Sequence, residues 1–132
     1  MGNPRPTLTG TLFVALGGFL GATARYGVDV ALPSALGATL AVNVVGSFLL
    51  GVLFFRSRRD DLLDRRLMLL IATGFVSSFT TYSTFVIDAL FAAPVTAGLY
   101  VIGSYLLGFA AVFFARPAGK RLATRRTSME EL

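Results

Sequence analysis

The chain has 132 residues, of which 55% are hydrophobic and 14% charged, and its mean hydropathy is +0.72. This composition excludes an ordinary soluble domain. Cys and His are absent, which excludes disulfides, zinc sites and imidazole acid–base catalysis. The net charge of +5 is compatible with nucleic-acid binding, but the basic residues lie at the ends of apolar segments, where membrane orientation explains them better. We therefore expect no nucleic-acid partner.

Four apolar segments are long enough to cross a bilayer as helices. We predict these helices at about 9–28, 36–55, 67–91 and 94–115. Each has the ~20 residues that a ~30 Å hydrocarbon core requires. The remaining residues suffice only for short loops and a basic cytoplasmic tail at 116–132, so residues 1–132 are predicted to form a single four-helix membrane domain.

The first two predicted helices combine small residues with a few polar ones. Gly17 and Gly21 lie four residues apart, so they share a helix face that allows close approach of another backbone. Arg25 ends the first apolar run, where it either snorkels to the interface or forms a vestibule charge that attracts anions. Asn43 lies about 10 Å below the surface at 1.5 Å per residue. Its amide either makes an interhelical hydrogen bond or donates to a passing anion.

The third predicted helix has a polar cluster in its middle. Residues 74–85, GFVSSFTTYSTF, contain six Ser or Thr hydroxyls and the phenol of Tyr82. In hydrocarbon, a polar cluster or a broken helix is tolerated only where it is buried in protein or lines a wet path. The sequence therefore predicts a broken third helix that forms a pore or a binding site. Phe79, Tyr82 and Phe85 recur every third residue, which predicts one shared helical face. That face either packs against lipid or the core, as aromatic stripes usually do, or presents weakly positive ring edges to an anion.

Basic residues follow the second and fourth predicted helices and precede the first. Eleven Lys and Arg residues belong to one side of the predicted domain: Arg5, Arg56, Arg58, Arg59, Arg65, Arg66, Arg116, Lys120, Arg121, Arg125 and Arg126. The opposite side has only Arg25. By the positive-inside rule we predict a multi-pass protein of the cell membrane with both termini in the cytoplasm.

Three motifs in a fixed order resemble the Fluc (CrcB) family of fluoride channels. They are GGFLGATARY at 17–26, GATLAVNVVGSFLLG at 37–51 and GFVSSFTTYSTF at 74–85, within a similarity that covers about residues 12–115. The resemblance implies an all-α integral membrane protein that is an antiparallel dimer with two pores. It further implies a passive, fluoride-selective channel that lets F⁻ leave the cell and so lowers cytoplasmic fluoride, with no enzymatic activity.

Motif position also implies roles for individual residues. The residues of the fluoride pore would be Asn43, Thr81, Tyr82, Ser83, Thr84 and Phe85. Arg25 would lie in the vestibule. A structural Na⁺, which is not transported, would be held by the backbone carbonyls of Ser77 and Thr80.

The chain departs from the family pattern in three places. Ser77 and Ser78 stand where two glycines are usual, so a Cβ restricts the backbone at the expected break. Tyr82 replaces the usual Phe, and its hydroxyl can compete for fluoride or bond a neighbour. In the fourth helix the polar residues Ser104 and Tyr105 are not continued by further hydroxyls.

The charge distribution bears on the predicted dimer. A homodimer of opposed subunits requires one sequence to insert in both orientations, which an eleven-to-one distribution of Lys and Arg disfavours. We therefore favour an antiparallel heterodimer with an oppositely oriented paralogue, and the homodimer is the alternative. Two other functions stay open. A small four-helix multidrug exporter would need a carboxylate in the centre of a span, and a non-transporting partner subunit of a membrane complex would need no hydroxyl cluster.

Overall fold

The computed structural model describes residues 8–57 and 65–130, with side chains for 8–56 and 66–122. The basic residues Arg5, Arg58 and Arg59 therefore lie outside the described residues.

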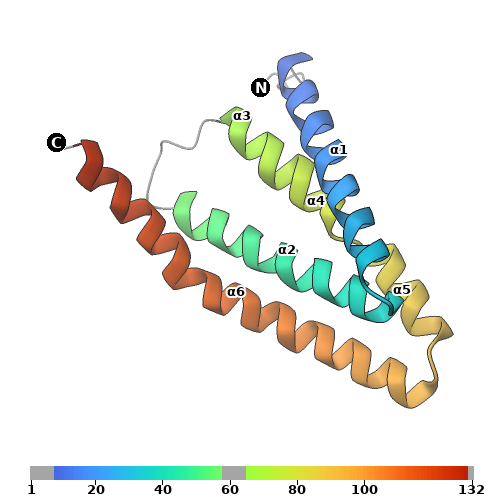
Figure 1. Cartoon of the computed structure of the whole chain (residues 1–132). Coiled ribbons are helices and arrows are strands. Elements are labelled where there is room, and N and C mark those ends of the chain that lie inside the picture. Colours follow the sequence, from blue (N-terminus) through green and yellow to red (C-terminus); the bar gives the residue numbers. More distant parts are fainter. Residues whose placement is uncertain (1–7, 58–64, 131–132) are drawn as a thin grey trace, which may run out of the picture.

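The described secondary structure is entirely helical (Figure 1). The elements are α1 Leu8–Ala31, α2 Ala35–Ser57, α3 Arg65–Met68, the π-helix η1 Leu69–Val76, α4 Ser77–Phe79, α5 Tyr82–Phe91 and α6 Pro94–Glu130. Segments α3 to α5 follow one another as parts of one long, interrupted helix, which we call the third span. Four helices in the described chain are long and apolar enough to cross a membrane. The predicted all-α architecture with a broken third helix is thus confirmed.

The four spans are arranged in two closely packed pairs. In Figure 1, α2 runs along α6, and α1 runs along the first half of the third span. Successive spans alternate in direction, so the start of α1, the end of α2, the start of α3 and the end of α6 lie toward the same end of the bundle. This arrangement leaves much of each helix without a protein neighbour within the chain.

Glycines allow the close contact between α1 and η1. A Cβ on Gly17 would overlap the backbone oxygen of Leu70, and a Cβ on Gly21 would overlap that of Phe75. From the other helix, a Cβ on Gly74 would lie 2.9 Å from the Cα of Gly17. The predicted small-residue packing of the first helix is therefore confirmed.

The break in the third span lies at Thr80 and Thr81. Thr80 has φ −81° and ψ 158°, and Thr81 has φ −148° and ψ 123°, so both are extended. Ser77 has helical torsions (φ −61°, ψ −36°), and Ser77 and Ser78 both belong to α4. No described residue has a positive φ. Serines in place of glycines are therefore compatible with this backbone, because neither serine occupies the interruption.

The fourth helix is longer than the predicted span. α6 continues from Pro94 to Glu130, through most of the segment expected as a basic tail. Pro117 lies inside it and removes one backbone donor. The helix continues because Pro117 is followed by strong helix formers, mainly Ala, Lys, Arg and Leu.

Candidate functional site between α2, α5 and α6

The side chain of Asn43 bonds the backbone at the break. Its Nδ2 donates to the Thr81 carbonyl oxygen at 2.9 Å, and the Thr81 N–H donates to its Oδ1 at 2.8 Å. An interrupted helix leaves backbone groups without their helical partners, and in a membrane each such group needs a substitute. Asn43 satisfies two of them with one amide. Of the two alternatives left open by the sequence, the interhelical hydrogen bond is present, and it uses one of the two N–H groups of the amide.

Thr81 begins α5 as its N-cap. Its Oγ1 accepts the Thr84 N–H at 3.2 Å and donates to Thr84 Oγ1 at 2.9 Å. The hydroxyl of Ser83 lies 3.4 Å from the same Oγ1. Thr81 is buried whereas Ser83 and Thr84 are exposed. Three predicted site residues therefore form one hydroxyl cluster at the start of a short helix.

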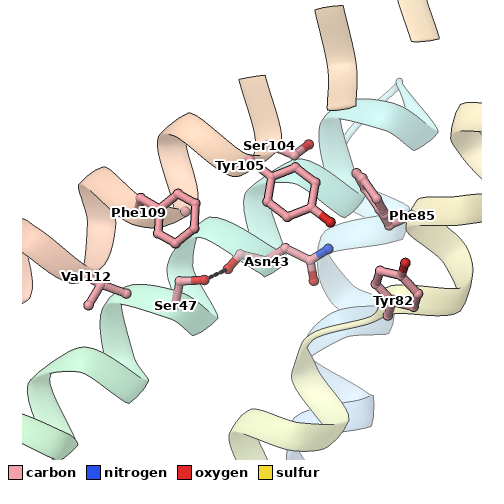
Figure 2. Close-up of a pocket in the computed structure, with 9 residues that line it drawn as sticks. Asn43, Ser47, Tyr82, Phe85, Ser104, Tyr105, Phe109 and Val112 are labelled. Atoms are coloured by element: carbon pink, nitrogen blue, oxygen red, sulfur yellow. Dashed lines mark hydrogen bonds between the residues drawn. The ribbon is translucent and has the colours of Figure 1, made fainter. Parts of the chain in front are cut away.

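A groove of about 300 Å³ opens next to this cluster (Figure 2). Its lining residues come from α2, α5 and α6: Asn43, Ser47, Tyr82, Phe85, Ser104, Tyr105, Gly108, Phe109 and Val112. The hydroxyl of Ser47 donates to the backbone oxygen of Asn43 at 2.8 Å. Ser104 Oγ is buried and has no hydrogen-bond partner among the described residues. Along α6 the lining changes from polar near Ser104 to apolar at Phe109 and Val112 (Figure 2).

Aromatic rings surround Phe85, which is buried. Its ring centroid lies 5.9 Å from that of Tyr82 and 5.2 Å from that of Tyr100. Tyr105 meets it edge to face, at 6.2 Å and 88°. Tyr82 itself is 72% exposed within the single chain. The groove therefore has aromatic rings on its wall and one open ring at its rim.

Phe79 does not belong to this aromatic set. Its ring stacks on Phe75 at 5.5 Å and 14°, before the break. The prediction that Phe79, Tyr82 and Phe85 share one helical face is wrong, because the extended residues between α4 and α5 interrupt the helical periodicity.

A second groove, of about 260 Å³, adjoins the break itself. It shares Asn43, Ser47 and Tyr82 with the first groove and extends to Val76, Thr80 and Thr81. Both grooves therefore meet at Asn43.

Arg25 reaches the break from α1. Its Nη1 lies 3.5 Å from the Thr80 carbonyl oxygen, to which it donates. This contact takes the guanidinium toward the interrupted part of the third span. Thr80 Oγ1 donates to the Val76 carbonyl oxygen at 3.0 Å, as does the Thr80 N–H.

A polar link that the sequence analysis did not predict joins α2 to the far end of α5. Thr39 Oγ1 donates to Asp88 Oδ2 at 2.6 Å, and Thr39 is buried. Thr39 and Asn43 are four residues apart, so they lie on the same face of α2. Two links from that face, Asn43–Thr81 and Thr39–Asp88, thus hold both ends of α5. The four-residue spacing of Thr39 and Asn43 in an otherwise apolar helix could have indicated this second link.

Comparison with known proteins identifies the family. A sequence model described as "CrcB-like protein, Camphor Resistance (CrcB)" matches residues 12–116. The chain belongs to the CrcB family. Over 104 residues, 78% of this chain and 87% of the relative, it is 49% identical to "Fluoride-specific ion channel FluC 1" of Natronomonas pharaonis. It is 45% identical over 114 residues to "Fluoride-specific ion channel FluC 1" of Haloarcula marismortui, covering 86% of this chain and 88% of that one.

A third CrcB relative shows the same extent of similarity. "Fluoride-specific ion channel FluC" of Oceanobacillus iheyensis is 40% identical over 119 residues, which is 85% of this chain and 89% of the relative. The predicted membership of the family of fluoride-specific ion channels, which are not enzymes, is confirmed. The multidrug-exporter alternative is thereby set aside.

In this CrcB chain, the structure brings most of the predicted site residues together. Those at or around the break and the grooves are Asn43, Thr80, Thr81, Tyr82, Ser83, Thr84 and Phe85, with Arg25 reaching the break from α1. Ser77 lies one helical turn before the break, in α4. Ser47 also lines both grooves, and the sequence analysis gave it no role at the site.

Proposed function

We propose that this fluoride channel conducts F⁻ passively along the groove between α2, α5 and α6. The observation that supports this path most strongly is the pair of hydrogen bonds between Asn43 and Thr81. They hold a helix interruption open inside a membrane span, next to hydroxyls and aromatic edges. An interruption of this kind is costly in hydrocarbon unless it borders a polar path.

The donors along this path are weak and arranged in series. The remaining N–H of Asn43, the hydroxyls of Ser83 and Thr84 and the ring edges of Phe85 and Tyr82 would replace water around F⁻ in turn. Conduction needs binding that is strong enough for entry and weak enough for exit, which such donors provide. HF enters the cell across lipid and dissociates there, so a selective passive exit for F⁻ lowers cytoplasmic fluoride.

A structural Na⁺ at the carbonyls of Ser77 and Thr80 is part of the proposal. Helical torsions end at Thr80, so the carbonyls of the last turn of α4 lack the N–H groups that a continuing helix would supply. Ser77 has helical torsions and Thr80, three residues later, is extended, so the two carbonyls lie at the start and just past the end of α4. Two carbonyls fill only part of a cation shell, so a second subunit would supply the remaining oxygens. The donation from Arg25 to Thr80 at 3.5 Å is weak enough to yield to Na⁺.

The proposed assembly is an antiparallel dimer in which both termini of this chain are cytoplasmic. Tyr82 is 72% exposed and the groove is open, which supports closure of the path by a second subunit. The one-sided Lys and Arg distribution favours an oppositely oriented paralogue as that subunit, with a second copy of this chain as the alternative.

Fluoride efflux from liposomes tests the function directly. The purified chain, alone and together with a candidate paralogue, is reconstituted into liposomes loaded with fluoride, and efflux is followed with a fluoride electrode. Efflux only with the paralogue supports the heterodimer, and efflux with the chain alone supports the homodimer. If neither preparation releases F⁻, the chain is a non-transporting subunit and the proposal is wrong.

Asn43→Asp tests the path. The substitution places a negative charge in the route of an anion and removes the Nδ2 donor to Thr81, so F⁻ efflux should fall at least tenfold, the equivalent of about 1.4 kcal/mol. Ser47→Ala is the comparison variant in the same groove wall, because it removes a hydroxyl that bonds the Asn43 backbone oxygen and adds no charge. Unchanged efflux in Asn43→Asp would remove Asn43 from the path.

A further inference from the structure

Helix α6 is longer than the bilayer requires. Its 37 residues, Pro94–Glu130, extend about 55 Å at 1.5 Å per residue. About 20 residues cross a ~30 Å hydrocarbon core. A crossing that starts at Pro94 therefore ends close to Ala115, and the helix continues beyond it as one rod past the end of α2 (Figure 1).

Near Ala115, the side chains on the surface of α6 change from apolar to basic. Phe113 and Phe114 are 69% and 66% exposed, as side chains in hydrocarbon should be. Arg116 follows two residues later and is exposed, as is Arg121, and Lys120 is half-buried. The first basic side chains of α6 therefore lie at the level of the lipid headgroups.

A glycine holds this part of α6 against the end of α2. A Cβ on Gly119 would lie 2.8 Å from the Val52 carbonyl oxygen and 3.3 Å from the Arg56 backbone nitrogen. Arg56 is in the last turn of α2 and so lies beside the basic residues of α6. We call this group, Arg56, Arg116, Lys120 and Arg121, the basic collar.

The collar lies far from the acidic side chains that the structure describes. Asp29 is near the end of α1 and Asp88 is near the end of α5, at the opposite end of the bundle (Figure 1). From the sequence, residues 116–132 contain five basic and two acidic residues. Residues 56–66, around the connection from α2 to α3, contain five basic residues and three acidic ones, Asp60, Asp61 and Asp64, so the two segments together carry a net charge of +5.

We propose that the basic collar binds the phosphate groups of anionic phospholipids. Charge complementarity supports this partner, and so does depth, because headgroup phosphates are the anions that a membrane holds at this level. Arginine and lysine form charge-assisted hydrogen bonds with phosphate, and arginine can do so with two parallel bonds. A basic group next to the end of a membrane helix attracts anionic lipid, with about fivefold stronger binding for each Lys or Arg near the surface. This interaction is independent of the fluoride path.

Lipid retention compared between charge-matched variants tests the collar. Wild type, R116Q/K120Q and R125Q/R126Q are purified and incubated with equal amounts of phosphatidylglycerol and phosphatidylcholine that carry the same acyl chains. Excess lipid is removed, and the retained lipids are counted by mass spectrometry. Both double variants lose two positive charges from α6, but Arg125 and Arg126 lie outside the collar, about 13 Å or more beyond Arg116 and about one helical turn beyond Arg121.

Wild type should retain phosphatidylglycerol in preference to phosphatidylcholine. The preference should fall about 25-fold in R116Q/K120Q, at about fivefold for each charge, and by a clearly smaller factor in R125Q/R126Q. Equal losses in the two variants would overturn the collar in favour of a diffuse charge effect, and a wild type without preference would overturn the proposal. Gel filtration checks that the variants remain folded. If R116Q/K120Q does not remain folded, Arg121→Gln is measured in its place. Its preference for phosphatidylglycerol should fall about fivefold, and an unchanged preference would count against the collar.

Discussion

Asn43 shows how one side chain can set the backbone of another helix. Thr81 lies 38 residues later in the chain, and both of its backbone hydrogen-bonding groups pair with the Asn43 amide. The sequence indicated that the third helix breaks, because hydroxyls gather in an apolar segment. It did not indicate that the break lies at Thr80 and Thr81, because that position depends on a distant amide. The expected sodium ligand Ser77 consequently lies in regular helix rather than in the interruption.

The buried ring of Phe85 gives a prediction at the same scale. Phe85→Leu keeps an apolar side chain of similar reach but removes the ring quadrupole, so fluoride efflux from liposomes should fall by up to about tenfold. Tyr82→Phe removes only a hydroxyl from an exposed ring and should leave efflux within about twofold. If Tyr82→Phe has the larger effect, the Tyr82 hydroxyl rather than the ring edges carries the anion.

Among the elements, α5 depends most on its polar contacts. It has ten residues, and extended residues precede and follow it. Its start is held by Asn43 and its end by the hydrogen bond from Thr39 to Asp88. Phe85 lies between these two contacts, so the position of its ring relative to α2 is fixed from both sides. Helical periodicity alone misplaced Phe79, because periodicity cannot be carried across an interruption.

The contact between α1 and η1 gives a prediction for an element. Gly17→Ala would drive a methyl group into the Leu70 backbone, so the two helices would have to separate, at a cost of about 1–3 kcal/mol. Gly27→Ala is the matched control, because α1 leaves open space around Gly27. The folded fraction after graded heating, measured by gel filtration in detergent, should fall for Gly17→Ala only. Equal stability of both variants would mean that α1 can move away from η1 without lowering the stability of the fold.

For the whole molecule, the sequence predicted the number and order of the spans better than their ends. Hydropathy locates apolar runs because the bilayer demands about 20 such residues. Hydropathy does not locate the end of a helix that continues beyond the hydrocarbon core. For this reason the predicted fourth helix stopped near residue 115, whereas α6 runs to Glu130. The rim of the groove is also exposed in the single chain, with Tyr82 72% accessible. In the proposed dimer, the properties of the path would therefore depend on the orientation in which the two subunits meet.

The orientation of the whole chain is the last prediction. C-terminal fusions to green fluorescent protein, which fluoresces in the cytoplasm, and to alkaline phosphatase, which is active outside it, should give fluorescence and no phosphatase activity. The reason is that eleven of the twelve Lys and Arg residues lie on the predicted cytoplasmic side. One added transmembrane segment between the chain and each reporter should reverse both signals. Comparable signals from both original fusions would mean that the chain inserts in both orientations, and the homodimer would then replace the heterodimer.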